Sequence, residues 1–560
     1  MQIKSKLEQL VASAIESAFE ESGFNIIDLP DCCLERPKDE TNGDWASTVA
    51  MRCAKALHAN PRIVAQTIID HLPANDVIAS CEIAGPGFIN FRITDKALQG
   101  VVKDVLLSGK DYGKGEKITS PCAVNIEYVS ANPTGPMHVG HGRWATLGDA
   151  IARIMRHAGY NVTEEFYIND HGVQLDTFGK SISLRYMELL GVGFEQPESF
   201  YGGAYVIDLA KEILDEDGTK WAKVSEEERV AAFKEIGYKR MLSSMKNTLS
   251  SFGTTFDVWF SERSLYTADK TGTTAIDRAL AYMDKKGCLY KKDNALWFKS
   301  TDYDDDKDRV LIKENGEFTY FMSDIAYHYD KLQRGFDHLI DIWGADHHGY
   351  VKRCEAMLEA WGYPGSLEVV LGQLVNLYRD GEVVRMSKRT GEMITFDEVL
   401  EEVGVDATRF MMLTRSSDQQ IDFDIELAKK QDATNPVYYV QYAHARICSV
   451  IRKAFGTEVV QGVALPNDLS MLTHESELAL MRKLDEFIEC VQIAARDRAP
   501  HRVARYAQDL AALYHQFYTN CHVICEDEAL QAARLALCDA TRIVLALSLN
   551  LLGVSTPERM

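Results

Sequence analysis

The sequence predicts an α/β protein whose central domain is built on a doubly wound parallel sheet. Two observations support this fold class. Residues 123–129 form a short apolar, β-branched run, a helical pattern follows, and residues 161–168 form a second such run. The same order of strand, turn and helix recurs over residues 338–363. Strands that alternate with helices indicate a parallel sheet with helices on both of its faces.

The two predicted helices each have one apolar face, as helices that cover a sheet must. Gly159 is placed to end the first helix, because glycine readily adopts the conformation found just after a helix. The apolar residues that recur at helical spacing are Leu147, Ile151, Ile154, Met155 and Ala158 in the first helix and Val351, Cys354, Leu358 and Trp361 in the second.

Two further domains are expected beside the central one. Residues 1–112 form an α+β unit that begins with an amphipathic helix and ends with a strand. The α/β domain covers residues 113–395, with an insertion at about 190–300 that mixes helical pattern with charged loops. Helical pattern then fills a connector at residues 396–440 and an all-helical domain at residues 441–560.

The composition is that of an ordinary globular protein, with 46% hydrophobic and 26% charged residues. A net charge of -22 argues against a protein that coats nucleic acid nonspecifically, because phosphate binding needs basic surface. A nucleic-acid partner held by local basic patches is still allowed. The 12 cysteines include no C-x-x-C pair, which suits a reducing cytoplasm. No apolar stretch is long enough to span a bilayer, so no membrane association is expected.

Residues 132–141, NPTGPMHVGH, join the first strand of the α/β domain to its helix. Such a turn presents backbone N–H groups and the positive end of a helix dipole, which suits phosphate. His138 and His141 would lie on the same side of the turn and can hydrogen-bond a phosphoryl oxygen as charge builds in a transition state. Gly140 and Gly142 would allow a ligand to approach the backbone closely.

Three other interpretations of this turn stay open at this point. An H-x-x-H pair occurs in metal sites, and residues 346–348 are the candidates for a third ligand. Residues 140–145 match the dinucleotide fingerprint G-x-G-x-x-A, with Glu164 or Glu165 about 20 residues further on. That fingerprint should follow its strand at once, whereas roughly ten residues intervene here. In a purely structural interpretation, the histidines cap the helix.

A second motif lies at residues 381–393, GEVVRMSKRTGEM. The preceding Asp-Gly pair predicts a tight hairpin, and a basic, polar loop follows. Arg385, Lys388 and Arg389 place three positive charges within five residues. A mobile cationic loop is what a triphosphate needs when pyrophosphate leaves. Taken alone, a solvated charged loop is the default interpretation.

Together, an H-x-G-H turn after the first strand and a later M-S-K loop resemble the two signatures of class I aminoacyl-tRNA synthetases. Other segments narrow the resemblance to arginyl-tRNA synthetases of the bacterial type. They are residues 127–141, 166–170, 320–328, 344–349 and 406–409, and the closing LLGVSTPERM. The resemblance runs from the N-terminal unit to the last residue. It implies a Rossmann-like catalytic domain.

By this resemblance the chain activates L-arginine with ATP to arginyl-adenylate, releases pyrophosphate, and transfers arginine to the 3′-terminal ribose of tRNA(Arg). Glu127 and Asp324 would face the guanidinium group, Tyr320 would add a hydrogen bond, and Asn132 would bind the backbone end of arginine. A planar cation with five donors calls for carboxylates in a fork geometry. Because Tyr320 and Asp324 are four residues apart, a helix-surface pair is the alternative.

The resemblance places ATP between the histidine turn and the M-S-K loop. His138 and His141 would stabilise the transition state at the α-phosphate, and Lys388 would neutralise the departing pyrophosphate. Mg²⁺ is expected with the triphosphate, and no metal site of the protein's own is expected. The other nucleotide contacts would come from Gly140, Asp346, His347, Met386 and Ser387.

The chain departs from the general class I signature at one position, because Arg385 stands where the K-M-S-K pattern has its first lysine. Arginine keeps the charge but lacks the compact ammonium group. Residues 132–136, just before the histidine turn, contain no lysine that could compensate. Lys388 should therefore carry more of the pyrophosphate chemistry.

Tyrosines and arginines are interleaved in the C-terminal part of the chain. Such residues stack unpaired bases and hold phosphates, although an amphipathic helix with a solvated basic face is the alternative. By the resemblance, the C-terminal domain recognises the anticodon, the N-terminal unit contacts the bend of the tRNA, and arginine activation depends on bound tRNA. The predicted tRNA contacts are Tyr438, Tyr442, Arg446, Arg502 and Met560.

The sequence therefore predicts a cytoplasmic, monomeric arginine–tRNA ligase. A first rival is a nucleotidyltransferase that shares the H-x-G-H turn but not the RNA step, and the long helical C-terminal part argues against it. A second rival is a non-catalytic tRNA-binding homologue. Intact His138, His141 and Lys388 argue against this second rival.

Overall fold

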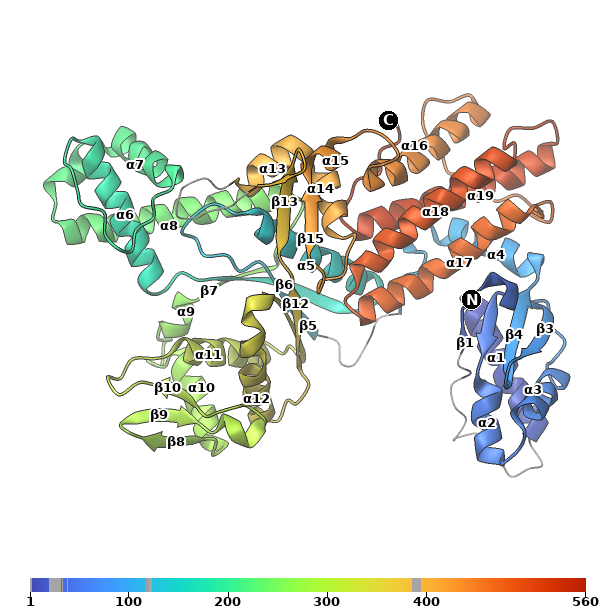
Figure 1. The fold of residues 1–560 in the computed structure, drawn as a ribbon, viewed down its shortest axis with the longest axis horizontal. Coiled ribbons are helices and arrows are strands. Elements are labelled where there is room, and N and C mark those ends of the chain that lie inside the picture. Colours follow the sequence, from blue (N-terminus) through green and yellow to red (C-terminus); the bar gives the residue numbers. More distant parts are fainter. Residues whose placement is uncertain are drawn as a thin grey trace.

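The computed structural model describes residues 3–19, 32, 34–37, 39–116, 118, 123–384 and 394–560. Figure 1 shows an elongated molecule with a central α/β domain, a helical C-terminal domain in orange and red, and an N-terminal unit in blue that lies beside the C-terminal helices.

The central sheet has five parallel strands in the order β12-β11-β5-β6-β7. The chain starts in the middle at β5, moves outward through β6 and β7, and then crosses to β11 and β12 on the other side. The predicted doubly wound parallel sheet is thus confirmed. Its strands are β5 (Ala123–Glu127), β6 (Asn161–Ile168), β7 (Val258–Ser261), β11 (His338–Gly344) and β12 (Leu367–Gly372).

The strand order reverses between β5 and β11, which are direct neighbours. Ligands of doubly wound sheets bind outside the carboxyl ends of the strands at such a reversal. The central positions of β5 are buried, as expected for a strand covered on both faces. The carboxyl ends of β5 and β11 are therefore the first place to look for a site.

Helix α5 (Val139–His157) connects β5 to β6 and contacts β5, β6 and β11. Its predicted apolar face is buried, and Gly159 follows it with a φ of 102°, a conformation that favours glycine. The other crossing helices are α11 (Tyr320–Gln333), which precedes β11, and α12 (Val351–Trp361), which follows it.

The segment predicted as one insertion at about 190–300 is divided by a strand of the central sheet. Before that strand, α6 (Val173–Leu189), α7 (Ala204–Asp217) and α8 (Glu226–Ser251) form a helical layer with its own hydrophobic core. After it come α9 (Arg263–Tyr266), α10 (Ala275–Lys285) and a small antiparallel sheet of β8 (Leu289–Lys292), β9 (Ala295–Phe298) and β10 (Arg309–Ile312). Only four residues make up the dividing strand β7, too few for a clear sequence signal.

The connector predicted as helical at residues 396–440 also contains a strand. That strand, β15 (Ile421–Asp424), pairs in parallel with β13 (Val375–Arg379), which forms a hairpin with β14 (Glu382–Val383). The connector helices are α13 (Phe396–Val403), α14 (Val405–Met412) and α15 (Ile425–Lys429). The helices of the C-terminal domain are α16 (Pro436–Phe455), α17 (Glu475–Arg496), α18 (Pro500–Asn520) and α19 (Glu528–Leu551).

The N-terminal unit is an α+β layer whose antiparallel sheet has the order β1-β2-β4-β3. Its last helix packs on α17 and α19, and Arg482 of α17 forms an ion pair of 2.6 Å with Asp44. The C-terminal helices thus connect this unit to the central domain. Its elements are α1 (Ile3–Phe19), β1 (Leu34–Glu35), β2 (Trp45–Ser47), α2 (Val49–Leu57), α3 (Pro61–Asp70), β3 (Ile78–Ala84), β4 (Phe88–Ile93) and α4 (Asp95–Ser108).

Candidate active site

The histidine turn lies at the carboxyl end of β5, where α5 begins. His138 is the residue before the helix, and its backbone N–H donates to Nδ1 of His141 over 3.2 Å. The two rings stack with their centroids 3.7 Å apart. The structure therefore brings both predicted histidines together at the positive end of a 19-residue helix, where an anion is favoured.

The two glycines of this turn have different surroundings. A Cβ atom at Gly142 would lie 2.1 Å from the ring of Phe396, so this glycine leaves room for a protein side chain and not for a ligand as predicted. A Cβ at Gly140 would meet only the ring of His138, at 3.0 Å. Gly142 thus lets α13 dock onto the first turn of α5.

The predicted M-S-K loop falls largely on residues 385–393, so Arg385, Met386, Ser387 and Lys388 lie outside the described residues. Both ends of the loop are described. The hairpin β13–β14 leads into it, and Thr395 at its far end pairs with His138. The backbone N–H of Phe396 also donates to the carbonyl oxygen of Met137 over 2.8 Å. The residues that follow the M-S-K loop therefore pair directly with the histidine turn.

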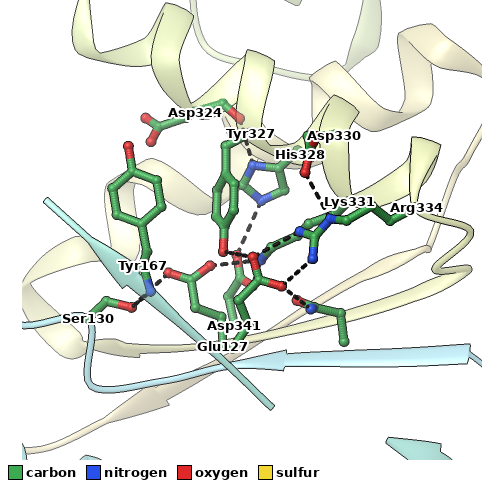
Figure 2. Close-up of polar contacts among 12 residues, drawn as sticks. Glu127, Ser130, Tyr167, Asp324, Tyr327, His328, Asp330, Lys331, Arg334 and Asp341 are labelled. Carbon is green, nitrogen blue, oxygen red and sulfur yellow. Dashed lines mark hydrogen bonds and ion pairs between the residues drawn. The ribbon is translucent and has the colours of Figure 1, made fainter. Parts of the chain in front are cut away.

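At the place where the strand order reverses, one carboxylate on β5 and one on β11 share a buried lysine (Figure 2). Nζ of Lys331 lies 2.7 Å from Oε2 of Glu127 and 3.0 Å from Oδ1 of Asp341, and the lysine side chain is 0% exposed. Ser130 donates to the other oxygen of Glu127 over 3.0 Å. Glu127, predicted to hold the substrate guanidinium, is thus already paired within the chain.

The neighbouring strand carries a third carboxylate that is also compensated. Arg334 makes two hydrogen bonds of 2.7 and 2.8 Å to the two oxygens of Glu165. Asn125 and Tyr327 add hydrogen bonds of 2.7 and 2.9 Å to the same carboxylate. Such a two-pronged, fully bonded pair is the form in which a charge is stable inside a protein.

Two further carboxylates, Glu262 and Asp324, form no ion pair with any residue in the described part of the chain. Glu262 directly follows β7, and Asp324 lies in the first turns of α11. Tyr167 of β6 hydrogen-bonds to Glu262, and the hydroxyl of Tyr350 donates to Asp324 over 2.6 Å. Figure 2 shows the side chains of Tyr167 and Asp324 on the same side of the ion-paired residues Glu127, Lys331 and Asp341.

The pKa values of this second pair show the cost of burial without a counter-ion. Burial, and after it the charges of Asp324 and Asp170, raise the pKa of Glu262 to about 7. Burial also raises the pKa of Asp324, against the hydrogen bond from Tyr350 and the charge of His328. Burial also raises the pKa of Glu127, which already pairs with Lys331, so what sets Glu262 and Asp324 apart is the lack of an ion pair with a described residue.

Asp170, at the end of β6, holds the backbone around Glu262. It accepts a hydrogen bond of 3.0 Å from the backbone N–H of Arg263 and one of 2.6 Å from the hydroxyl of Ser261. The hydroxyl of Tyr238 on α8 donates to it over 2.9 Å. Asp170 thus holds both sequence neighbours of Glu262, Ser261 and Arg263, and so fixes the position of Glu262.

The other predicted contacts surround this region. Tyr320 begins α11 and is 79% exposed, and Asn132 is exposed in the histidine turn. Asp346 and His347 follow β11 in a short 3₁₀ helix, with exposed side chains 3.7 Å apart. All four lie at the carboxyl ends of strands or in the loops and helix starts near them, and their individual roles stay predictions.

Two of the alternative interpretations of the histidine turn can be compared with the structure. Among the described residues, no group of three or more His, Cys, Asp or Glu side chains could hold a metal ion. The acidic residues of the dinucleotide interpretation are engaged elsewhere, since Glu164 binds Tyr128 and Arg156 while Glu165 binds Arg334. Phe396 fills the space over Gly142 that the fingerprint reserves for the approach of the pyrophosphate.

The predicted tRNA contacts divide between separate places. Tyr442, Arg446 and Met560 line one cavity of about 790 Å³ in the C-terminal domain. The guanidinium of Arg446 lies 4.8 Å from the ring centre of Tyr442 and 5.2 Å from that of Tyr518. Tyr438 stacks on Tyr442 at 6.1 Å, whereas Arg502 lines another cavity.

The sequence interpretation missed three basic residues of this cavity, Arg452, Lys453 and Arg559. The last of these comes from the closing segment of the chain, which passes beside α16. His444 of α16 holds that segment through a contact of 2.9 Å with the carbonyl oxygen of Pro557. The spacing of residues in the sequence does not indicate that the end of the chain folds back to line this cavity.

Comparison with known proteins agrees with this architecture. The described fold resembles methionyl-tRNA synthetase of Mycobacterium tuberculosis, with a TM-score of 0.55 and 15% identity over 78% of this chain and 92% of that one. At that identity the likeness shows the fold alone. Residues 101–455 match the family model of the class I (R) tRNA synthetase catalytic domain. The fold and the histidine turn thus define a class I aminoacyl-tRNA synthetase.

The two flanking domains and the full-length relatives narrow this class. Residues 5–93 match the arginyl tRNA synthetase N terminal domain, and residues 440–560 match the DALR anticodon binding domain. An arginine–tRNA ligase of Syntrophotalea carbinolica is 46% identical over 100% of both chains, and one of Geobacillus thermodenitrificans is 45% identical over 100% of this chain and 98% of its own. Arginyl-tRNA synthetase of Thermus thermophilus has a TM-score of 0.75 at 25% identity, covering 99% of this chain and 100% of that one.

The chain belongs to the arginyl-tRNA synthetase family. Its reaction is the charging of tRNA with arginine at the expense of ATP, as the sequence predicted. The two rival functions, a nucleotidyltransferase without an RNA step and a non-catalytic homologue, are thereby set aside. In the described part of the chain, no helix is long and apolar enough to cross a membrane.

Proposed function

We propose that the guanidinium group of L-arginine binds between Glu262 and Asp324. One observation carries this assignment: the buried Glu262 and the half-buried Asp324 form no ion pair with a described residue, whereas Glu127, Glu165 and Asp341 each form one. A bound guanidinium supplies the missing charge and up to five N–H donors. We therefore assign the guanidinium contact to Glu262 and not, as the sequence predicted, to Glu127.

Discrimination against other amino acids follows from the same two carboxylates. A neutral side chain leaves both of them buried and unpaired, which costs several kcal/mol. The ammonium group of lysine supplies the charge but not the planar fork, so part of the hydrogen-bonding capacity stays unused. Tyr320 adds a hydrogen bond at the exposed end of the pocket, and Asn132 binds the backbone end of arginine.

Adenylate formation uses the groups around the histidine turn. A carboxylate oxygen of arginine attacks the α-phosphorus of ATP, and the bond to pyrophosphate breaks. His138 and His141 donate hydrogen bonds to the α-phosphoryl oxygens as charge builds, with the start of α5 behind them. Lys388 neutralises the departing pyrophosphate, and Gly140, Asp346, His347, Met386 and Ser387 complete the nucleotide contacts. A Mg²⁺ ion bound to the triphosphate would offset part of its charge.

Transfer to tRNA then needs no covalent enzyme intermediate. The terminal ribose hydroxyl attacks the carbonyl carbon of the adenylate, and AMP leaves. The C-terminal cavity with Tyr442, Arg446 and Met560, and Tyr438 stacked on Tyr442, offer stacking surfaces and cations to unpaired bases of tRNA(Arg). Arg502 offers a separate phosphate contact. We further propose a monomer in the cytoplasm, where free thiols such as those of Cys53, Cys288 and Cys354 are stable.

The assay that tests this function is ATP–pyrophosphate exchange with each of the twenty amino acids, with and without total tRNA. Exchange is expected with arginine alone and only when tRNA is present. Lys388→Ala should lower the exchange rate about 100-fold or more while arginine binding changes little. Arg385→Ala, the matched control in the same loop, should have the smaller effect. Equal loss of rate and of arginine affinity in Lys388→Ala would place that lysine in ground-state binding instead.

A further inference from the structure

His328 lies one turn after Asp324 on the inner face of α11, and its ring joins that helix to β11 (Figure 2). Nδ1 lies 2.8 Å from the backbone carbonyl oxygen of Asp324, and Nε2 lies 3.2 Å from Oδ2 of Asp341. We propose that His328 is a permanently charged imidazolium that acts as a positioning residue for Asp324. This inference rests on the arginine contact proposed above for Asp324.

The charge of the ring follows from the two atoms that it faces. A backbone carbonyl oxygen only accepts hydrogen bonds, and so does an ionised carboxylate. A neutral imidazole carries a single N–H and would leave one of these two buried contacts without a proton. Since the side chain of His328 is 4% exposed, water does not replace the missing partner. Either the ring carries both protons or Asp341 carries one.

Lys331 decides between these two arrangements. Its ammonium group lies 3.0 Å from the other oxygen of Asp341 and donates to it. Burial raises the pKa of Asp341, but Lys331 and His328 outweigh burial, and the pKa falls well below its usual range. Burial lowers the pKa of His328, but the hydrogen bond and charge of Asp341 outweigh it, and the pKa rises above 6.5. The proton therefore belongs to the ring.

The charge balance of the cluster supports the same protonation state. Glu127 and Asp341 are two carboxylates that share one buried cation, Lys331, whose charge favours the ionised form of both against burial. A charged His328 makes the cluster neutral, whereas a neutral ring would leave one negative charge uncompensated in the interior, at a cost of several kcal/mol. The cluster is thus complete without the substrate.

The groups that surround His328 come from every element packed around it. On the side of the arginine pocket, Asp324 receives the charges of His328 and of Arg353, and both lower its pKa. The titratable and charged groups in this region are Asp324, Tyr327 and Lys331 on α11, Asp341 on β11, Glu127 on β5, Glu165 on β6, Tyr350 before α12, and Arg353 and Cys354 on α12.

A charged ring has two consequences for arginine binding. It opposes the effect of burial on Asp324 and so favours the ionised carboxylate before arginine binds. It also ties the carbonyl group of Asp324 to the sheet through Asp341, which fixes the first turns of α11. His328 does not touch the substrate. It acts through Asp324, by keeping a ready-made anion where the guanidinium arrives.

The protonation state can be measured directly by ¹⁵N NMR of the histidine rings in the intact protein. His328 is expected to show two protonated nitrogens at pH 7.5. His444 is the internal control, because it is also buried and faces the carbonyl of Pro557, but burial lowers its pKa. It should show a neutral ring at the same pH. A neutral ring of His328 at pH 7.5 would overturn the proposal, and this reading needs no variant to fold.

The positioning role is tested by His328→Gln in the pyrophosphate exchange assay with tRNA present. The KM for arginine should rise about fivefold or more, because Asp324 loses a neighbouring positive charge and the contact that holds its turn, while kcat and the KM for ATP stay within about twofold. An unchanged arginine KM would refute the positioning role. A second variant, Asp324→Asn, tests the arginine contact itself. An unchanged arginine KM in Asp324→Asn would refute that contact, whereas the NMR result on the charge of His328 would still stand.

Discussion

Two sets of buried carboxylates lie near the same edge of the central sheet, and they differ in what neutralises them. Glu127, Glu165 and Asp341 are paired with Lys331 and Arg334 inside the chain. Glu262 and Asp324 receive hydrogen bonds from tyrosines but no ion pair from the described residues. A buried anion is costly without an ion-pair partner, so the second set is suited to a cation that comes from outside the chain. The difference separates structural charges from those that bind substrate.

The largest loss of stability should come from removing the lysine that neutralises Glu127 and Asp341. Lys331→Met leaves Glu127 and Asp341 buried without their shared cation and is expected to destabilise the catalytic domain by about 3–5 kcal/mol. The measurement is the midpoint of urea unfolding. Lys313→Met removes an exposed ion pair of 3.0 Å with Glu317 and serves as the control, with an expected loss of at most about 1 kcal/mol. Equal losses in both variants would mean that the buried cluster is not held by Lys331.

A smaller effect is expected from pH, and it sharpens the same comparison. Glu262 has a pKa of about 7 in the empty protein, because burial and then its acidic neighbours favour its neutral form. Arginine binds the ionised form, so its KM should be flat above about pH 8 and rise up to tenfold per pH unit as the pH falls below about 7. Glu262→Gln removes the group that titrates and should flatten this profile. An arginine KM that is independent of pH between 5.5 and 8 in the unmodified chain would contradict the assignment.

Much of the fold was predictable because its elements are long or regularly patterned. The strands at 123–127 and 161–168 and the helix that ends before Gly159 stand where apolar periodicity placed them. The four-residue strand β7 has no such pattern, and it lies in a stretch that was taken for an insertion. The carboxyl end of β7 therefore went unnoticed, and with it Glu262. A Ser-Glu-Arg run directly after a short aromatic strand was the one local signal.

The pairing of charges could not be predicted either, because it depends on contacts between distant parts of the sequence. Glu127 was expected to face the guanidinium group of arginine, but its partner in the structure, Lys331, lies 204 positions away in the sequence. Nothing in the spacing says that this lysine turns to β5 and β11 instead of to solvent. In the same way, the sequence shows Gly142 but not that the ring of Phe396 fills the space above it.

The most direct test of the account is to compare Glu262→Gln with Glu127→Gln in pyrophosphate exchange with tRNA present. Both variants exchange one carboxylate for an amide of the same shape. In Glu262→Gln the KM for arginine should rise by about 30-fold or more, since the loss of one partner from a buried charge pair costs at least about 2 kcal/mol. In Glu127→Gln it should change less than about fivefold, with unfolding affected instead. A larger arginine defect in Glu127→Gln than in Glu262→Gln would contradict the division into structural and substrate-binding carboxylates.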